Sequence, residues 1–408
     1  MTKERAGERV IKKIGSSHVI WFPESNRWME FKEPAWFIYN KIETGENEQS
    51  ITVQLTQRYG LPGKEALRFF RDIKNNINLS VRPPGGSEPG RGNETAGTVP
   101  VSLTDRSKSR RYVTRHYLVN KKHLTISYGS PLLEYYIHRP LAHLETGKQP
   151  ADSLRIRLFE EVTGGAGDRS YYLQFEAPAG GSRSFSFKES GLLKHRLYTA
   201  ITSHIYGIPE EGWMSFIHAS AVTNGREAAL LPSASGSGKS TMAALLQLPA
   251  DKSLSGSHGD LFFMSDDFVA VAAESAKAYP FPAAITVKEG SFDVIAPYYD
   301  TDHDADAGYR GLTSSRVRYL CPRLPGNNPY GPLPVKNLIF IKHTPGNPFR
   351  LRKLDTLSAL AAFHEEAWVS QNPVHAQRFI DWFVTLECHK LEYDDSRKAV
   401  QAIRELLK

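Results

Sequence analysis

The order of apolar and polar positions predicts two folded modules, separated by a stretch with almost no core-forming residues. In the first module, residues 19–22 (VIWF) and 28–31 (WMEF) are strand-like runs on either side of the turn PESNR. Helical spacing follows at 34–42, at 50–59 and from Pro62 onwards. The last helix places these apolar residues on one face: Ala66, Phe69, Phe70, Ile73 and Ile77. The pattern predicts a hairpin followed by three helices.

The stretch between the modules is residues 81–111, VRPPGGSEPGRGNETAGTVPVSLTDRSKSRR. It is rich in Pro, Gly, Ser and charged residues, so it cannot bury enough apolar surface to order itself. We predict a flexible linker there. The expected domains are therefore 1–80, a small N-terminal domain, and 112–408, a large C-terminal domain.

The second module begins with strand-like segments at 115–129, 154–162 and 169–177, followed by a helix at about 189–206. The strands FIHASAV and EAALL, joined by TNGR, then form a hairpin that leads directly into a loop of small residues. Further along, LFFMSDDFVAVAA is a strand, a carboxylate pair and another strand. Strands alternating with helices in this way predict an α/β fold with a mixed sheet.

The loop of small residues resembles a phosphate-binding (Walker A) loop. An apolar run at 228–231 precedes it, and a segment of helical spacing at 242–248 follows it. This order aims backbone N–H groups and a helix N-terminus at one anion. Serine stands where the consensus G-x-x-x-x-G-K-[ST] begins with glycine, which is tolerated if the turn needs no positive φ. The predicted nucleotide contacts are Ser233, Ala234, Ser235, Gly236, Ser237, Gly238, Lys239, Ser240 and Thr241. The alternative is a chance Gly/Ser loop before a helix.

Within this loop, Lys239 can reach the β- and γ-phosphates, and the Ser240 hydroxyl can bind Mg²⁺. The implied cofactors are ATP and Mg²⁺. Phosphoryl transfer also needs a carboxylate for the metal and a base for the acceptor hydroxyl. Asp266 and Asp267 follow a strand, so their side chains point different ways and can divide these roles. The alternative is a solvated turn. His218, in the strand before the loop, is either a packed histidine or part of the site.

The composition adds few constraints. Across 408 residues, Lys and Arg number 51 against 44 acids, a net charge of +7 that suits an anionic ligand such as ATP. No basic run with interleaved aromatics indicates nucleic acid. Cys321 and Cys388 are far apart and read as reduced thiols. No apolar run reaches the ~18 residues of a membrane span, and no apolar signal core begins the chain. We expect a cytoplasmic protein without a membrane span; its oligomeric state stays open, a homo-oligomer included.

The first module resembles the PqqD-like peptide-recognition domains, also called RiPP recognition elements. The hairpin, EPAWFIYNKIETG, SITVQLTQRYGL and the final amphipathic helix follow their layout over about 60 residues. The resemblance implies a winged-helix-like fold that captures a leader peptide by adding its strand to a sheet edge. The alternative is a scaffold of the same type that binds no peptide.

The second module resembles HPr kinase/phosphorylase and its relatives, whose domain is similar to phosphoenolpyruvate carboxykinase. The shared order is FIHASAV, then EAALLPSASGSGKST, then FFMSDDFVAV. The resemblance implies that His218, Lys239 and Asp267 are the active-site residues, with Asp267 accepting the proton of a serine hydroxyl. It also implies that Ser240 binds Mg²⁺, and Asp266 is a candidate second ligand.

The chain departs from the bacterial HPr kinases after the third strand. Their Glu and Arg are replaced by Thr286 and Lys288 within PFPAAITVKEGSFDVI. Three segments instead resemble the HPr-kinase-related kinases of peptide-modification and exosortase-linked clusters: PAAITVKEGSFDVI, YRGLTSSRVRYLCPR and HKLEYDDSRKAVQAIREL. Lys288, Arg316 and Arg318 are candidates for binding phosphate or the phospho-acceptor, or else exposed cations. Residues 298–311, acidic and glycine-containing, are expected to form a mobile loop over the site.

The sequence as a whole leads us to expect an ATP-dependent serine kinase. It would transfer the γ-phosphate to a Ser or Thr hydroxyl of a peptide or small protein that the first module captures by its leader. Two alternatives stay open. One is a nucleotide-binding assembly or regulatory protein without phosphotransfer, and the other is a small-molecule, carboxykinase-like kinase.

Overall fold

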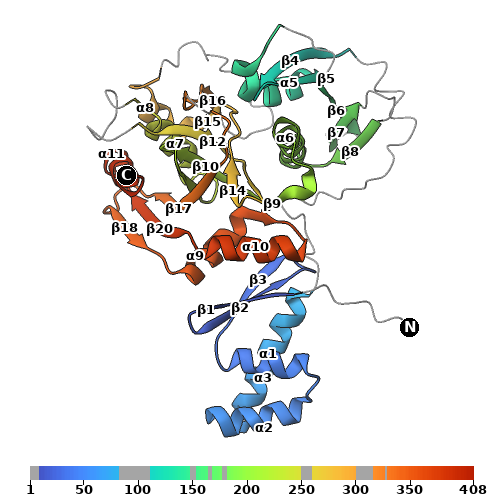
Figure 1. Ribbon diagram of the computed structural model, residues 1–408, viewed down its shortest axis with the longest axis vertical. Coiled ribbons are helices and arrows are strands. Elements are labelled where there is room, and N and C mark those ends of the chain that lie inside the picture. Colours follow the sequence, from blue (N-terminus) through green and yellow to red (C-terminus); the bar gives the residue numbers. More distant parts are fainter. Residues whose placement is uncertain are drawn as a thin grey trace. The chain divides into compact units, whose positions relative to one another are not determined.

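The protein has a mixed α/β architecture, as expected from the sequence (Figure 1). This computed structural model describes residues 9–81, 111–147, 153–163, 168–176, 182–249, 260–299, 316–326 and 329–408. The predicted linker falls almost entirely on residues 82–110, and the predicted mobile loop on 300–315; both stretches lie outside the described residues.

The chain forms two compact units, each of which is assembled from separate segments. Unit 1 comprises Met1–Gly86, Asp355–Glu365 and Val369–Thr385. Unit 2 comprises Ser87–Leu354, Glu366–Trp368 and Leu386–Lys408. The sequence analysis assigned all of 112–408 to the second domain, whereas two of its segments lie in unit 1.

Unit 1 contains the predicted hairpin and helices, plus a strand that the sequence did not indicate. Its antiparallel sheet has the order β1-β2-β3, and its strands are β1 (Val10–Ile14), β2 (Ser17–Phe22) and β3 (Arg27–Phe31). Three helices follow: α1 (Ala35–Glu43), α2 (Glu48–Tyr59) and α3 (Gly63–Ser80). Helix α2 begins where the Asn47 side chain accepts a hydrogen bond from the Ser50 N–H, and it ends at Gly60, whose φ is +69°.

Both faces of the unit 1 sheet are covered by helices. On one face, Ile20, Phe22 and Phe31 pack with Ile77 of α3. The other face carries Trp21 and Trp28, which are cross-strand partners. There Trp28 contacts Phe379 of α10 (Pro373–Phe383), with ring centroids 6.0 Å apart, and α9 (Thr356–Phe363) joins the same aromatic cluster through Phe363. The N-terminal strands therefore share a core with helices from near the C-terminus.

Unit 2 contains a five-stranded sheet of order β4-β5-β6-β7-β8. Its strands are β4 (Val113–Val119), β5 (Lys122–Tyr128), β6 (Leu154–Thr163), β7 (Asp168–Glu176) and β8 (Ser182–Phe187). Apolar residues of this sheet pack with Leu193, Leu197 and Ile201 of α6 (Ser190–Tyr206), the helix predicted at 189–206. Helix α5 (Pro131–His138) packs on the same core through Leu133 and Ile137.

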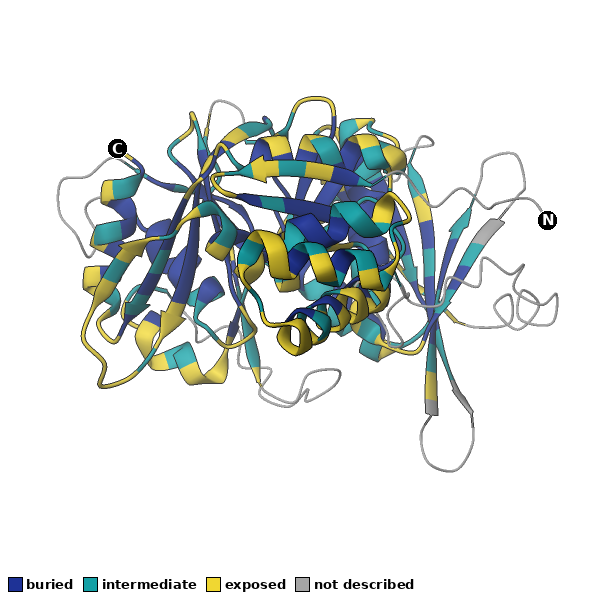
Figure 2. Ribbon diagram, turned by 90° about the horizontal axis from the view of Figure 1, so that it is seen from below, coloured by how far each residue is buried: buried dark blue, intermediate teal, exposed yellow. Residues whose placement is uncertain are grey.

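The larger sheet of unit 2 carries the candidate site. Its main path has the order β12-β10-β11-β17-β14-β13-β9-β19, and β20 pairs with β17 and β18. The bounds are β9 (Trp213–Ile217), β10 (Ala219–Thr223), β11 (Ala228–Pro232), β12 (Phe262–Ser265), β13 (Val269–Ala272), β14 (Lys277–Tyr279), β17 (Leu333–His343), β18 (Arg350–Lys353), β19 (Ala367–Val369) and β20 (Glu387–Tyr393). Strands β9, β10, β11 and β13 are buried along their whole length, whereas β18 is mostly exposed. Figure 2 shows buried residues in dark blue.

The strand directions bring several loops to one edge of this sheet. Strands β11, β17 and β20 run parallel, and β10 is antiparallel to both β11 and β12. The carboxyl ends of β11, β12, β17 and β20 consequently meet at the same edge, together with the start of β10. Ligands of open α/β sheets bind at such an edge.

Short elements complete unit 2. Helices α7 (Lys239–Leu246) and α11 (Ser396–Leu406) pack against each other through Met242, Leu246, Val400 and Ile403. A separate two-stranded ribbon pairs β15 (Ile285–Lys288) with β16 (Val317–Leu320), and α8 (Phe292–Ile295) follows β15. In the part of the chain that the structure describes, no helix is long and apolar enough to cross a membrane.

Candidate functional site

In the loop between β11 and α7, two glycines adopt a left-handed backbone conformation that favours glycine. The φ angles of Gly236 and Gly238 are +86° and +99°, values that L-amino acids with side chains rarely adopt. The φ of Ser233 is not positive, so a serine fits at the position where glycine is usual. Its hydroxyl accepts a hydrogen bond of 2.9 Å from the N–H of Ile341, which ties the start of the loop to β17.

Lys239 is buried beneath this loop, with only 5% of its surface exposed. Its ammonium group donates hydrogen bonds to the carbonyl oxygens of Ser233 and Ala234. Burial lowers the pKa of Lys239, because the charged form loses hydration there. The loop thus holds a cation at its centre, beside backbone N–H groups at the start of a helix, which is an arrangement suited to an anion.

Asp266 lies behind the loop and is almost completely buried. Its Oδ1 accepts hydrogen bonds from the hydroxyls of Ser220 at 2.5 Å and Ser240 at 3.1 Å, and its Oδ2 accepts one from the Thr286 N–H at 3.1 Å. Burial and the neighbouring charge of Asp267 raise the pKa of Asp266 to about 6.

The contact between Ser240 and Asp266 fits the predicted Mg²⁺ site. It places a hydroxyl and a carboxylate oxygen side by side, and these are the oxygen donors that Mg²⁺ takes from a protein when phosphates and water complete its shell. Among the described residues, no group of three or more His, Cys, Asp or Glu side chains could hold a metal on its own. A metal here would therefore need further ligands from phosphate oxygens or water.

His218 lies between two carboxylates. Its Nδ1 is 2.7 Å from Oε2 of Glu366, and its Nε2 is 3.6 Å from Oδ1 of Asp267. The sequence analysis placed His218 within a strand, but the structure places it in the break between β9 and β10, where its backbone N–H donates to the Glu366 carbonyl at 2.7 Å. Because His218 lies outside both strands, its side chain is not bound to the alternation of a strand, and its ring contacts both carboxylates.

These contacts set the charges of the three groups. The Asp267 carboxylate at 3.6 Å and the hydrogen bond with Glu366 raise the pKa of His218 to about 9, so the ring is an imidazolium at neutral pH. For Asp267, burial favours the protonated acid, but the nearby imidazolium of His218 and the ammonium of Lys194 outweigh it and hold the pKa well below its usual range. Asp267 also has a φ of +61°, a left-handed conformation that aspartate adopts more readily than most residues with a side chain.

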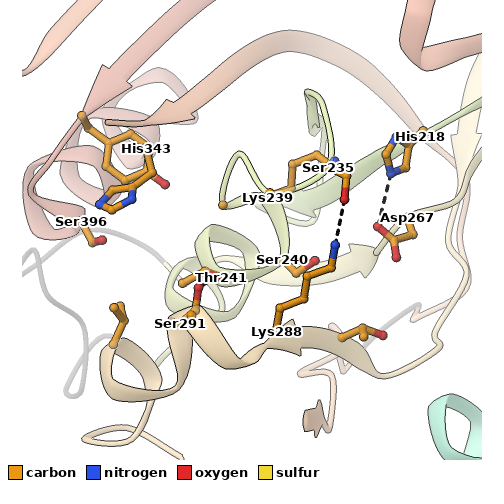
Figure 3. Close-up of a pocket in the computed structure, with 16 residues that line it drawn as sticks. His218, Ser235, Lys239, Ser240, Thr241, Asp267, Lys288, Ser291, His343 and Ser396 are labelled. Carbon is orange, nitrogen blue, oxygen red and sulfur yellow. Dashed lines mark hydrogen bonds and ion pairs between the residues drawn. The ribbon is translucent and has the colours of Figure 1, made fainter. Parts of the chain in front are cut away.

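A cavity of about 420 Å³ joins these groups (Figure 3). The predicted residues that line it are His218, Ser235, Gly236, Gly238, Lys239, Ser240, Thr241, Asp267 and Lys288. The loop residues Ser233, Ala234 and Ser237 and the buried Asp266 do not line it. Residues that the sequence analysis did not propose as site residues complete the lining, among them Ser291, His343, Tyr393 and Ser396.

The three candidate cations have different surroundings. Lys288 lines the cavity and donates a 2.8 Å hydrogen bond to the hydroxyl of Ser235 in the loop. Arg316 and Arg318 do not line it. Arg316 pairs with Glu289 at 2.9 Å, and Arg318 lies 4.1 Å from the ring centroid of Phe292. Arg318 is the cross-strand partner of Val287, not of Lys288, so it projects from the opposite face of the ribbon.

Two charged residues of the site have no local sequence signal. Glu366 is 148 positions from His218, and its side chain is only 10% exposed. Lys194 comes from α6, where its ammonium lies 5.7 Å and 5.3 Å from the ring centroids of Tyr136 and Tyr198. The Tyr198 ring also contacts Phe268, the neighbour of Asp267, at 5.8 Å between centroids. Only the tertiary fold brings these groups to Asp267.

A comparison of the chain with models of known protein families and with curated proteins found no match.

Proposed function

We propose that this protein is an ATP-dependent kinase that transfers the γ-phosphoryl group to a serine or threonine hydroxyl of a peptide or small protein. The observation that carries the proposal is the cavity in which the loop cation Lys239 faces the Asp267–His218–Glu366 chain. A triphosphate needs a cation such as Lys239 to bind its negative charge, and an acceptor alcohol needs a carboxylate such as Asp267 to take its proton. We also infer that unit 2 contains a P-loop domain similar to that of HPr kinase.

The nucleotide's phosphates would lie along the loop. Lys239 and the backbone N–H groups of the loop would bind the β- and γ-phosphates, and Lys288 is placed to bind an exposed phosphate oxygen. Ser240 and Asp266 would hold Mg²⁺, which when bound neutralises charge on the β- and γ-phosphate oxygens.

In the reaction, the acceptor oxygen forms a bond to the γ-phosphorus while the bond from that phosphorus to the β–γ bridging oxygen breaks. The hydroxyl proton passes to the carboxylate of Asp267, and ADP leaves with the bridging oxygen, whose negative charge Lys239 stabilises. His218 is already protonated at neutral pH, so its role is to hold Asp267 in place rather than to act as the base.

Unit 1 would supply the substrate. We infer that it is a PqqD-like, winged-helix-like module in which β1 or β3, the two edge strands of its sheet, pairs with the strand of a leader peptide. Because both units belong to one chain, capture of the leader would raise the local concentration of the acceptor for unit 2.

The experiment that tests this function is co-expression with short peptides encoded by neighbouring genes, followed by mass spectrometry for the gain of one phosphoryl group. We expect a phosphopeptide with the wild type and none with Lys239→Ala or Asp267→Asn. The control variants Lys277→Ala and Asp293→Asn, which change exposed residues, should behave as the wild type.

Binding measurements distinguish the kinase from a nucleotide-binding assembly protein. Asp267→Asn should abolish transfer but retain ATP binding, because Asp267 acts on the acceptor and not on the nucleotide. If the wild type binds ATP and orders a partner, but no peptide or protein ever gains a phosphate that depends on Asp267, the kinase is ruled out.

A further inference from the structure

One end of the cavity has no role in the phosphate chemistry described above. It is formed by the carboxyl ends of β17 and β20, which contribute His343 and Tyr393, and by Ser396 at the start of α11. Figure 3 shows His343 and Ser396 on one side of the loop, and His218 and Asp267 on the other. The loop therefore divides the cavity into two ends of different chemistry.

This inference rests on the proposed function, which fixes the direction in which the triphosphate would run through the cavity. The γ-phosphate must lie near Asp267, because that carboxylate receives the acceptor proton. The β-phosphate then lies within the loop beside Lys239. In helix α7, Thr241 comes directly after Ser240, the proposed metal ligand. A triphosphate that runs from Asp267 through the loop must continue toward the ends of β17 and β20. The nucleoside then belongs at His343.

His343 has the properties of a surface for a flat ring. Its side chain lines the cavity and is exposed. Its backbone N–H donates a 3.1 Å hydrogen bond to the carbonyl of Ser237, so the residue is attached to the phosphate loop itself. The ring of Tyr393, which is almost completely buried, supports it at 5.4 Å between centroids and an interplanar angle of 53°.

We propose that the nucleoside base of the triphosphate stacks on the imidazole of His343, with Tyr393 holding that ring in place. A base presents a flat π-face, and stacking on an aromatic side chain needs no specific hydrogen bond. Tyr393 and Ser396 line the same end of the cavity, so their hydroxyl groups would lie near the sugar. The phosphate contacts and the base contact would thus be made by different residues.

The two contacts can be separated with ligands that do and do not carry a base. We would titrate the full-length protein with Mg-ATP and with Mg-tripolyphosphate, for the wild type and for His343→Ala, His343→Phe and the control Lys342→Ala. Lys342 is the exposed neighbour of His343 and does not line the cavity. Because the side chain of His343 is exposed, its replacement should leave the fold intact.

We expect His343→Ala to weaken ATP binding about 5- to 100-fold while changing tripolyphosphate binding by less than about twofold. His343→Phe, which keeps a flat ring, should bind ATP nearly as the wild type does, and so should Lys342→Ala. The inference is overturned if His343→Ala binds ATP normally, or if it loses both ligands equally. A wild type that binds neither ligand would instead remove the proposed function, and this inference with it.

Discussion

Oε2 of Glu366 lies 2.7 Å from Nδ1 of His218, and the Glu366 carbonyl accepts a second hydrogen bond from the His218 backbone N–H. Glu366 thus holds both the ring and the main chain of the histidine that faces Asp267. The glutamate belongs to Glu366–Trp368, a short part of unit 2 that is flanked in sequence by two segments of unit 1. The residues that precede and follow this short segment in the chain therefore belong to unit 1.

If Glu366 positions His218, Glu366→Gln should lower kcat by about 10- to 100-fold, as loss of an outer-shell partner does in other sites. KM for ATP should stay nearly constant, because Glu366 does not line the nucleotide cavity. The His218 ring should also titrate at lower pH in an NMR measurement, since it loses a negatively charged partner. Glu365→Gln, at the exposed neighbouring position, is the control; equal effects of both variants would contradict the assignment.

The charge of His218 gives a dependence of stability on pH. Its pKa is raised from 6.5 to about 9 in the folded protein, so the fold favours the protonated ring. This stabilisation is complete below the unfolded value and disappears as pH rises through about 9. The wild type should exceed His218→Gln in free energy of unfolding at about pH 6 and lose that advantage near pH 10, as measured by urea denaturation. A constant difference across this range would show that the ring is not held as an imidazolium.

Gly238 should not tolerate a side chain. Its φ is +99°, and a Cβ atom there would lie 2.8 Å from the hydroxyl of Tyr393. Gly238→Ala should therefore cost about 1–2 kcal/mol of stability from the backbone alone and weaken ATP binding by displacing Tyr393. Gly290→Ala is a matched control, because Gly290 also lines the cavity but a Cβ there meets nothing within 4 Å. Thermal unfolding and ATP titration would measure both effects, and similar results for the two variants would refute this explanation.

The shared core of unit 1 predicts that its C-terminal helix stabilises its N-terminal strands. Phe379→Ala should lower the free energy of unfolding by about 3–5 kcal/mol, because Phe379 is fully buried against Trp28 and Phe363. Val374→Ala, on the same helix but 58% exposed, should change it by less than about 0.5 kcal/mol. Deletion of residues 1–80 should also expose α10 and promote aggregation. A deletion variant as stable as the full chain would show that the two segments fold independently.

The parts of the site that follow from local sequence were predictable. The strand, loop and helix around Lys239 lie within about 20 residues, and so do the strands on either side of Asp266 and Asp267. The direction in which a side chain points was harder to predict from the sequence. A shift of one residue along β16 turns a side chain to the other face, so the sequence could not show that Arg318 points away from Lys288.

The remaining residues depend on tertiary structure. Glu366, Lys194, His343 and Tyr393 reach the cavity or its carboxylates from distant segments, and no spacing in the sequence relates them to the loop. The place of α9 and α10 in unit 1 also depends on tertiary structure. Helices α9 and α10 follow the larger sheet in the chain, but their apolar faces fit the sheet of unit 1.

The most direct test of the account is single-turnover transfer from γ-labelled ATP to a serine-containing peptide identified by co-expression. We predict transfer by the wild type and a loss of about 100-fold or more in Asp267→Asn, whose affinity for ATP is retained. Transfer that proceeds at the same rate without the Asp267 carboxylate, or a wild type that binds ATP and transfers nothing to any hydroxyl, would contradict it.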